Sequence, residues 1–160
     1  MEPINWFMKV VTQHYFDFNG RARRAEFWWY ILVYIILAII VNVIDSIIHL
    51  NGLLGLALLL PNLGVWARRL HDTNRSGWWI LAPLVPYCLA FVLGGAAMMG
   101  GAAAGSTAGM GAGMGIAGIF LLIGAACAIA LLVFYCLPGT PGDNQYGPNP
   151  YGDGSSVPAE

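Results

Sequence analysis

The densest group of side chains capable of chemistry lies between residues 68 and 75. This stretch carries Arg68, Arg69, His71, Asp72 and Arg75. A histidine oriented by a carboxylate is a common general base. Residues 71 and 72 are adjacent, however, and adjacent residues on a helix do not face each other, so Asp72 is a poor orienter for His71. The pattern favours a structured turn with paired charges, and we predict no catalytic residue and no enzyme activity.

A second polar group, Arg21, Arg23, Arg24 and Glu26, directly precedes the first apolar segment. Guanidinium groups bind lipid phosphates through paired hydrogen bonds, and basic residues beside a span also fix its orientation; both interpretations stay open. We expect Glu26 to pair with an arginine of one of the two groups. The expected partners are the lipid bilayer, through anionic phospholipid headgroups, and another membrane protein or a second copy. The charge pattern does not suggest nucleic acid.

Cysteines and histidines give no metal or cofactor pattern. The three cysteines lie in apolar segments and form no C-x-x-C pair, and the three histidines are far apart in the sequence. Buried, reduced thiols are the expected state. We therefore predict no metal-binding and no cofactor-binding residue.

Composition places the chain in a membrane. Of its 160 residues, 58% are hydrophobic and 9% are charged, whereas soluble domains carry roughly a quarter of charged residues. All seven Lys and Arg residues precede the first apolar run or separate the second from the third. Because cytoplasmic loops collect basic residues, we predict a multi-pass protein of the bacterial inner membrane with a cytoplasmic N-terminus.

The apolar runs predict an all-α membrane protein with about four transmembrane helices in residues 27–137. The expected spans are 27–46, 53–69, 78–98 and 116–137, and Pro61, Pro83 and Pro86 should interrupt two of them. Residues 1–26 form a cytoplasmic amphipathic and basic segment, whose helix we expect at the membrane interface, without excluding packing on the protein's own cytoplasmic face. The polar residues 138–160 predict a disordered tail, cytoplasmic if the span count is even.

Residues 94–115 form an insertion rich in glycine, alanine and methionine. Gly101, Gly105, Gly109 and Gly113 recur at every fourth position. On a helix they would form a small-residue stripe for close packing, and as a loop they would form a flexible linker. We expect the linker, because each glycine costs a helix about 1 kcal/mol relative to alanine.

Three blocks carry a resemblance to a known family: residues 16–28, residues 68–79 and residues 141–150. With them the chain resembles the small bacterial inner-membrane proteins grouped as domain of unknown function 805. The resemblance implies an integral inner-membrane protein and supplies no reaction. In the four-span arrangement all three blocks reach the same membrane face, which predicts a cytoplasmic polar cluster. Its expected members are Arg21, Arg24, Glu26, Arg68, Arg69, His71, Asp72, Asn144 and Tyr146.

Two functions fit these features. The leading one is a non-enzymatic structural or assembly component of the membrane, because the spans carry small-residue faces and lack the ionisable groups that ion-coupled carriers place inside the membrane. The alternative is a small transporter or channel subunit for a small solute. Proline-broken helices motivate it, since broken helices are common at substrate sites.

Overall fold

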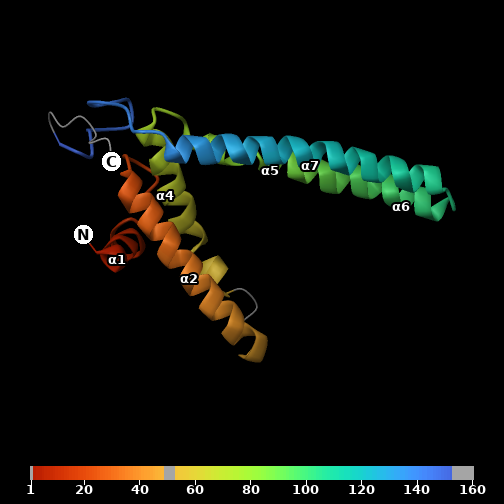
Figure 1. Cartoon of the computed structure of the whole chain (residues 1–160), viewed down its shortest axis with the longest axis horizontal. Helices are drawn as coiled ribbons and strands as arrows, with labels where there is room; N and C mark the ends of the chain where they lie inside the picture. Colours follow the sequence, from red (N-terminus) through yellow and green to blue (C-terminus); the bar gives the residue numbers. More distant parts are fainter. Residues whose placement is uncertain (1, 49–52, 153–160) are drawn as a thin grey trace. The chain divides into compact units, whose positions relative to one another are not determined.

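A computed structural model describes residues 2–48 and 53–152, and the last part of the expected tail lies outside this range. The described chain is built of helices without a β-strand (Figure 1), which confirms the all-α prediction. It divides into two compact units, one made of Met1–Gly77 with Tyr135–Glu160 and the other of Trp78–Phe134.

The first unit begins with the amphipathic helix α1, Pro3–Gln13, with proline in its first turn. Phe7 and Val10 are buried, and the Phe7 ring stacks on Tyr30 of α2, Arg24–Ile48, at a centroid distance of 5.3 Å. Packing of α1 on its own protein is therefore observed. Ile4 and Met8 remain exposed, so the placement of α1 at the lipid interface stays a prediction.

Helix α2 is accompanied by a return arm made of α3, Leu53–Ala57, and α4, Leu59–Asp72. Glu26 of α2 pairs with Arg68 of α4, and the Tyr30 hydroxyl donates to Asn62 Oδ1 at 2.8 Å. Since a position later in α2 meets a position earlier in α4, the two helices run antiparallel (Figure 1). The arm thus returns the chain to the level where α2 begins.

The return arm is interrupted at Leu58, between α3 and α4. Pro61 has no backbone N–H, so it cannot bond the carbonyl of Ala57 four residues earlier. The Tyr15 hydroxyl donates to that Ala57 carbonyl instead. The break expected near Pro61 is confirmed, and the freed acceptor has a partner from another segment.

Three described helical stretches are long and apolar enough to cross a membrane: Arg24–Ile44, Gly77–Ala103 and Thr107–Cys136. The expected number of about four spans is therefore approximate, because the interrupted arm at 53–72 is not one of the three. Between 11% and 17% of the most apolar window of each stretch is buried by the chain itself. Lipid or partner helices must cover the remaining apolar surface.

The second unit is a helical hairpin. Its first limb consists of a 3₁₀ helix η1, Gly77–Leu81, then α5, Leu84–Leu89, a π-helical turn η2, Ala90–Gly94, and α6, Gly95–Ala103. Its second limb is α7, Thr107–Cys136, whose last two residues, Tyr135 and Cys136, belong to the first unit. The irregular start of the first limb coincides with Pro83 and Pro86, which remove two helical donors.

The expected linker at 94–115 is wrong, because this region forms the tip of the hairpin. A Cβ added to Gly101 would collide with the backbone of Gly109 and Met110, and one added to Gly113 would collide with Met98. Only glycine permits such close backbone approach, and the resulting contacts offset its low helix propensity. Gly105 makes the turn with φ +63°, and Ser106 Oγ accepts the backbone N–H of Gly109 at 3.1 Å.

The chain after α7 also differs from the expected disordered tail. Residues 137–152, which we call the C-terminal strap, lie against the end of α4 and the segment before α2. Thr140 donates its backbone N–H to the Asp72 carbonyl at 2.8 Å. Asn144 donates its side-chain amide to the His71 carbonyl at 2.9 Å. The strap buries little apolar surface and is held by hydrogen bonds to buried polar residues, which composition alone does not reveal.

Candidate functional site

The centre of the polar cluster is one carboxylate between two arginines. Arg21 Nε donates to Asp72 Oδ1 at 2.9 Å, and Arg69 Nη1 donates to Asp72 Oδ2. The side chains of Arg69 and Asp72 are fully buried, and that of Arg21 is 1% exposed. Arg21 precedes α2, whereas Arg69 and Asp72 lie one turn apart on α4. We call these three residues the Arg–Asp–Arg group.

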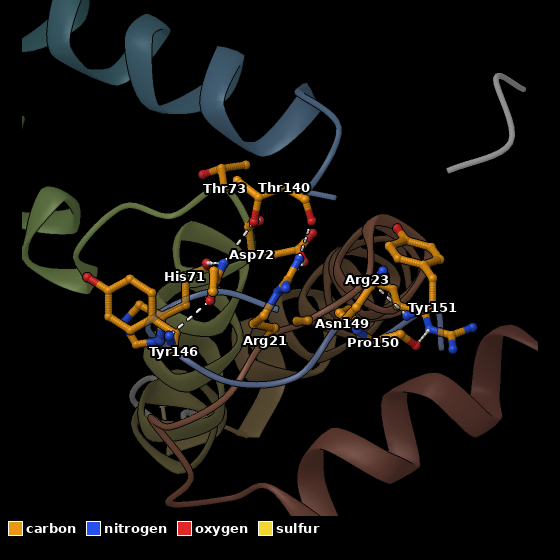
Figure 2. Close-up of polar contacts among 12 residues, drawn as sticks. Arg21, Arg23, His71, Asp72, Thr73, Thr140, Tyr146, Asn149, Pro150 and Tyr151 are labelled. Carbon is orange, nitrogen blue, oxygen red and sulfur yellow. Dashed lines mark hydrogen bonds and ion pairs between the residues drawn. The ribbon is translucent and has the colours of Figure 1, made fainter. Parts of the chain in front are cut away.

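Main-chain carbonyls of the strap and of the end of α7 satisfy the remaining guanidinium donors. Arg21 donates to the carbonyls of Gly142 at 2.6 Å and Thr140 at 2.7 Å (Figure 2). Arg69 donates to the carbonyls of Tyr135 at 3.1 Å and Leu137. Because two guanidinium ions face one carboxylate, these carbonyl dipoles compensate the excess positive charge.

Gly139 of the strap lies directly on the Asp72 carboxylate. A Cβ at this position would collide with both carboxylate oxygens. Thr140 follows it and donates both its backbone N–H and its hydroxyl to the Asp72 carbonyl, at 2.8 Å and 3.2 Å. The side chain and the backbone of Asp72 thus contact the strap at successive positions.

His71 and Tyr146 form the outer edge of the cluster. Their rings are parallel within 2°, with centroids 3.9 Å apart (Figure 2). His71 Nδ1 lies 3.2 Å from the Gly20 carbonyl, and Gly20 has a left-handed φ of +79°. Burial lowers the pKa of His71, and the Gly20 carbonyl opposes that shift. Burial therefore disfavours the charged imidazolium, and the ring is covered by a strap residue.

A second ion-pair group lies nearby in the same unit and joins α1, α2 and α4. Glu26 accepts a hydrogen bond from Arg68 Nη1 at 2.8 Å on one oxygen and from Lys9 Nζ at 3.2 Å on the other. Glu26 and Arg68 are each 3% exposed in their side chains, whereas Lys9 is 30% exposed. We call these residues the Lys–Glu–Arg group. The expectation that Glu26 pairs with an arginine of the two basic groups agrees with this contact.

The structure brings together eight of the nine residues expected in the cluster, in two groups rather than one. Arg24 joins neither: it is half-buried, and its backbone N–H donates to the Tyr151 hydroxyl at 3.4 Å. Its neighbour Arg23 contacts the strap instead, donating to the Pro150 carbonyl with its guanidinium over the Tyr151 ring (Figure 2). Three blocks distant in the sequence thus meet in one unit.

Sequence reasoning missed Lys9, Gly139 and Thr140. Lys9 carried a usable signal, because it is the one charged residue of helix α1. The other two act mainly through their backbone, and backbone carbonyl acceptors leave no trace in residue type.

Asp72 and His71, the side chains of the cluster that could do chemistry, are both engaged by neighbouring residues. Within residues 2–48 and 53–152, no group of three or more His, Cys, Asp or Glu side chains is arranged to hold a metal ion. The Asp72 carboxylate is held by two guanidinium groups, and the His71 ring is covered by Tyr146. The arrangement is suited to fixing three chain segments to each other at one end of the α2–α4 pair.

Comparison with known proteins places this architecture in a family. Residues 15–148 match the family described as protein of unknown function (DUF805). The chain is 32% identical over 156 residues to the inner membrane protein YhaH of Escherichia coli (strain K12), covering 92% of this chain and 97% of that protein. It is 34% identical over 152 residues to the inner membrane protein YhaI of the same strain, covering 92% and 96%. No solved structure matches.

The chain belongs to this DUF805 family, as the three blocks predicted. Its relatives carry inner-membrane names, and its described helices include three that can cross a membrane. It is therefore an integral inner-membrane protein. The cytoplasmic side of its termini stays a prediction from the distribution of Lys and Arg.

Proposed function

We propose that this protein is a non-enzymatic membrane component that assembles through its hairpin helices with a second copy or with another membrane protein. The observation that carries the proposal is a face of α7 that its own hairpin leaves open. A Cβ at Gly111, Gly115 or Gly118 would meet nothing within 4 Å, whereas Gly109, Gly113 and Gly124 are closed by contacts within the second unit.

The open glycines follow each other at spacings of four and three residues, so they share one side of the helix. Small residues at this spacing let a second helix approach closely in a bilayer, where dispersion contacts rather than hydrophobic burial drive association. The closed glycines show that the same helix already uses this kind of packing inside the chain. The open face therefore supports a contact between molecules.

The polar cluster supports the same conclusion from the other unit. In its Arg–Asp–Arg group, the carboxylate and the guanidinium groups bond to each other and to main-chain carbonyls. These contacts hold chain segments together and give this group a structural role. In this proposal the first unit anchors the protein and the second presents the assembly surface.

Site-specific photo-crosslinking in native membranes tests the proposal. A photoreactive residue at position 115 should give a protein adduct of defined mass, which mass spectrometry identifies. Gly115→Leu should abolish the adduct formed from a photoreactive residue at position 118 without lowering the thermal stability of the purified protein. Lipid adducts alone, with no protein adduct from positions 111, 115 or 118, would rule out assembly through this face.

A transporter or channel subunit is the second candidate, favoured by the irregular first limb of the hairpin. The limb changes from a 3₁₀ helix to α, to a π-helical turn and back to α between Gly77 and Ala103. Broken helices and π turns are frequent at ligand sites in membrane proteins. Flux assays in liposomes separate the candidates: solute uptake above that of empty vesicles supports transport, and its absence across a broad solute panel removes it.

A further inference from the structure

The Lys–Glu–Arg group contains a buried guanidinium that is only partly used. Arg68 donates from Nη1 to Glu26, but its Nε and Nη2 atoms are buried and have no hydrogen-bond partner among the described residues. The residue is 2% exposed. Buried donors of a charged group without acceptors are costly, so they point to an acceptor that the chain itself does not provide.

The two unpaired atoms are not independent donors. Nε and Nη2 lie on the same edge of the planar guanidinium group, and their N–H bonds point in parallel. This edge matches two oxygens of one phosphate or carboxylate, the geometry in which arginine binds oxyanions most strongly. The unused part of Arg68 is thus a complete bidentate fork.

Charge in the group favours an anion. Lys9 and Arg68 carry two positive charges against the single carboxylate of Glu26. Asp17 is a nearby acid whose charge also interacts with Arg68, but its oxygens are engaged by His14 at 2.7 Å and by the Asn19 backbone N–H at 3.0 Å, and no hydrogen bond joins it to Arg68. Within the Lys–Glu–Arg group, positive charge therefore exceeds negative charge beside the unpaired edge of Arg68.

The location of the group identifies the source of the anion. Glu26 lies in the first turn of a helix that can cross the membrane, so the group sits at the level of the lipid headgroups. Lys9, its partly exposed member, comes from amphipathic helix α1, and its ammonium lies 5.3 Å from the Trp6 ring centre. Tryptophan and lysine together are typical of the membrane interface.

We propose that the Lys–Glu–Arg group binds the phosphodiester of one anionic phospholipid, with the phosphate oxygens on Arg68 Nε and Nη2 and with Lys9 at the entrance. The lipid enters where Lys9 is exposed and replaces part of the Lys9–Glu26 contact. This inference concerns the first unit and goes beyond the assembly proposed for α7. Loss of lipid binding and loss of protein crosslinking can therefore be told apart.

Arg68→Lys is the decisive variant, because it keeps a positive charge for Glu26 and removes the bidentate edge. Purified protein in detergent is titrated with phosphatidylglycerol, and the rise in thermal stability and the lipid retained in native mass spectrometry are measured. We expect Arg68→Lys to weaken phosphatidylglycerol binding by roughly tenfold or more. In lipid-free detergent its thermal stability should equal or exceed that of wild type, because two unpaired donors are gone.

Controls separate the alternatives. Arg23→Lys, the same change in the other basic segment of the first unit, should leave binding unchanged, and equal weakening by both variants would show a general basic surface and overturn the site. Equal stabilisation by diacylglycerol, which lacks phosphate, or by inorganic phosphate alone would overturn the phospholipid assignment. Unchanged phosphatidylglycerol binding by Arg68→Lys would overturn the proposal. A loss of thermal stability in lipid-free detergent by both Arg68→Lys and Asp17→Asn would overturn it as well, since Asp17 would then be the occupant of the Arg68 edge.

Discussion

His71 at the end of α4 and Tyr146 in the C-terminal strap stack face to face, with ring centroids 3.9 Å apart. Seventy-five positions separate them in the sequence, and the Asn144 amide, two residues before Tyr146, bonds the His71 carbonyl. The contact joins two of the three blocks that characterise the sequence. It also makes the protonation of His71 a measure of whether the strap is in place.

The first prediction concerns pH. Burial lowers the pKa of His71 below its usual value near 6.5, so the docked state binds fewer protons than the undocked state between that lowered pKa and about 6.5. Strap docking should therefore be fully stable above about pH 6.5 and weaken as the pH falls through this window. An NMR titration of the His71 ring checks this. The pKa of His71 should rise toward 6.5 in Tyr146→Ala, and an identical titration in both proteins would contradict the contact.

A methyl group at position 139 should displace the strap. Gly139→Ala places a Cβ against both oxygens of the buried Asp72 carboxylate, and overpacking of this kind costs about 1–3 kcal/mol. Chymotrypsin should then cleave after Tyr146 faster than in wild type. Gly118→Ala, where an added Cβ meets nothing within 4 Å, is the matched control and should leave the cleavage rate unchanged. Equal protection of the strap in both variants would show that it does not lie on Asp72.

Replacement of glycine by alanine should have opposite effects on thermal stability at two positions near the hairpin tip. Gly113→Ala should destabilise the second unit, because its Cβ would collide with the backbone and side chain of Met98. Gly111→Ala, two residues away on the open side, should be neutral or stabilising by up to about 1 kcal/mol through better helix propensity. Thermal unfolding followed by circular dichroism compares them. A flexible linker would instead make the two substitutions equivalent.

Removing the charge of Asp72 should strongly destabilise the protein, although Asp72→Asn hardly changes the size of the side chain. Asp72→Asn leaves Arg21 and Arg69 buried without their carboxylate, and breaking a buried pair in this way costs about 3–5 kcal/mol. We expect lower abundance in the membrane and a lower unfolding temperature in detergent. Glu2→Gln changes an exposed carboxylate that caps no backbone group, so it should match wild type in both measurements.

Sequence patterns predicted much of this architecture because charge and hydropathy act locally. The distribution of arginines and the apolar runs predicted a helical membrane protein. The resemblance of three blocks, together with the span count, predicted that Arg21, Asp72 and Asn144 would meet. The contact of Arg21 with Asp72 and of Asn144 with the His71 carbonyl agrees with this.

Two parts could not be predicted, for separate physical reasons. The strap is held by backbone carbonyls such as those of Thr140 and Gly142, and these acceptors are present in every residue. The low helix propensity of glycine predicts a linker at the hairpin tip. The glycines there are instead stabilised by the close approach of a second segment, as between Gly101 and Gly109. Helix propensity describes a single segment, so it does not include this contact.

The most direct test of the central claim measures the proximity of His71 and Tyr146 in the membrane. His71→Cys and Tyr146→Cys are combined in a protein whose three native cysteines are alanine, with a protease site inserted at the Gly105 turn. After treatment of native membranes with a short bifunctional thiol reagent and cleavage at the turn, the two fragments should remain joined. Each single-cysteine protein should separate. Separation of the fragments in the double variant would contradict the docking of the strap on α4.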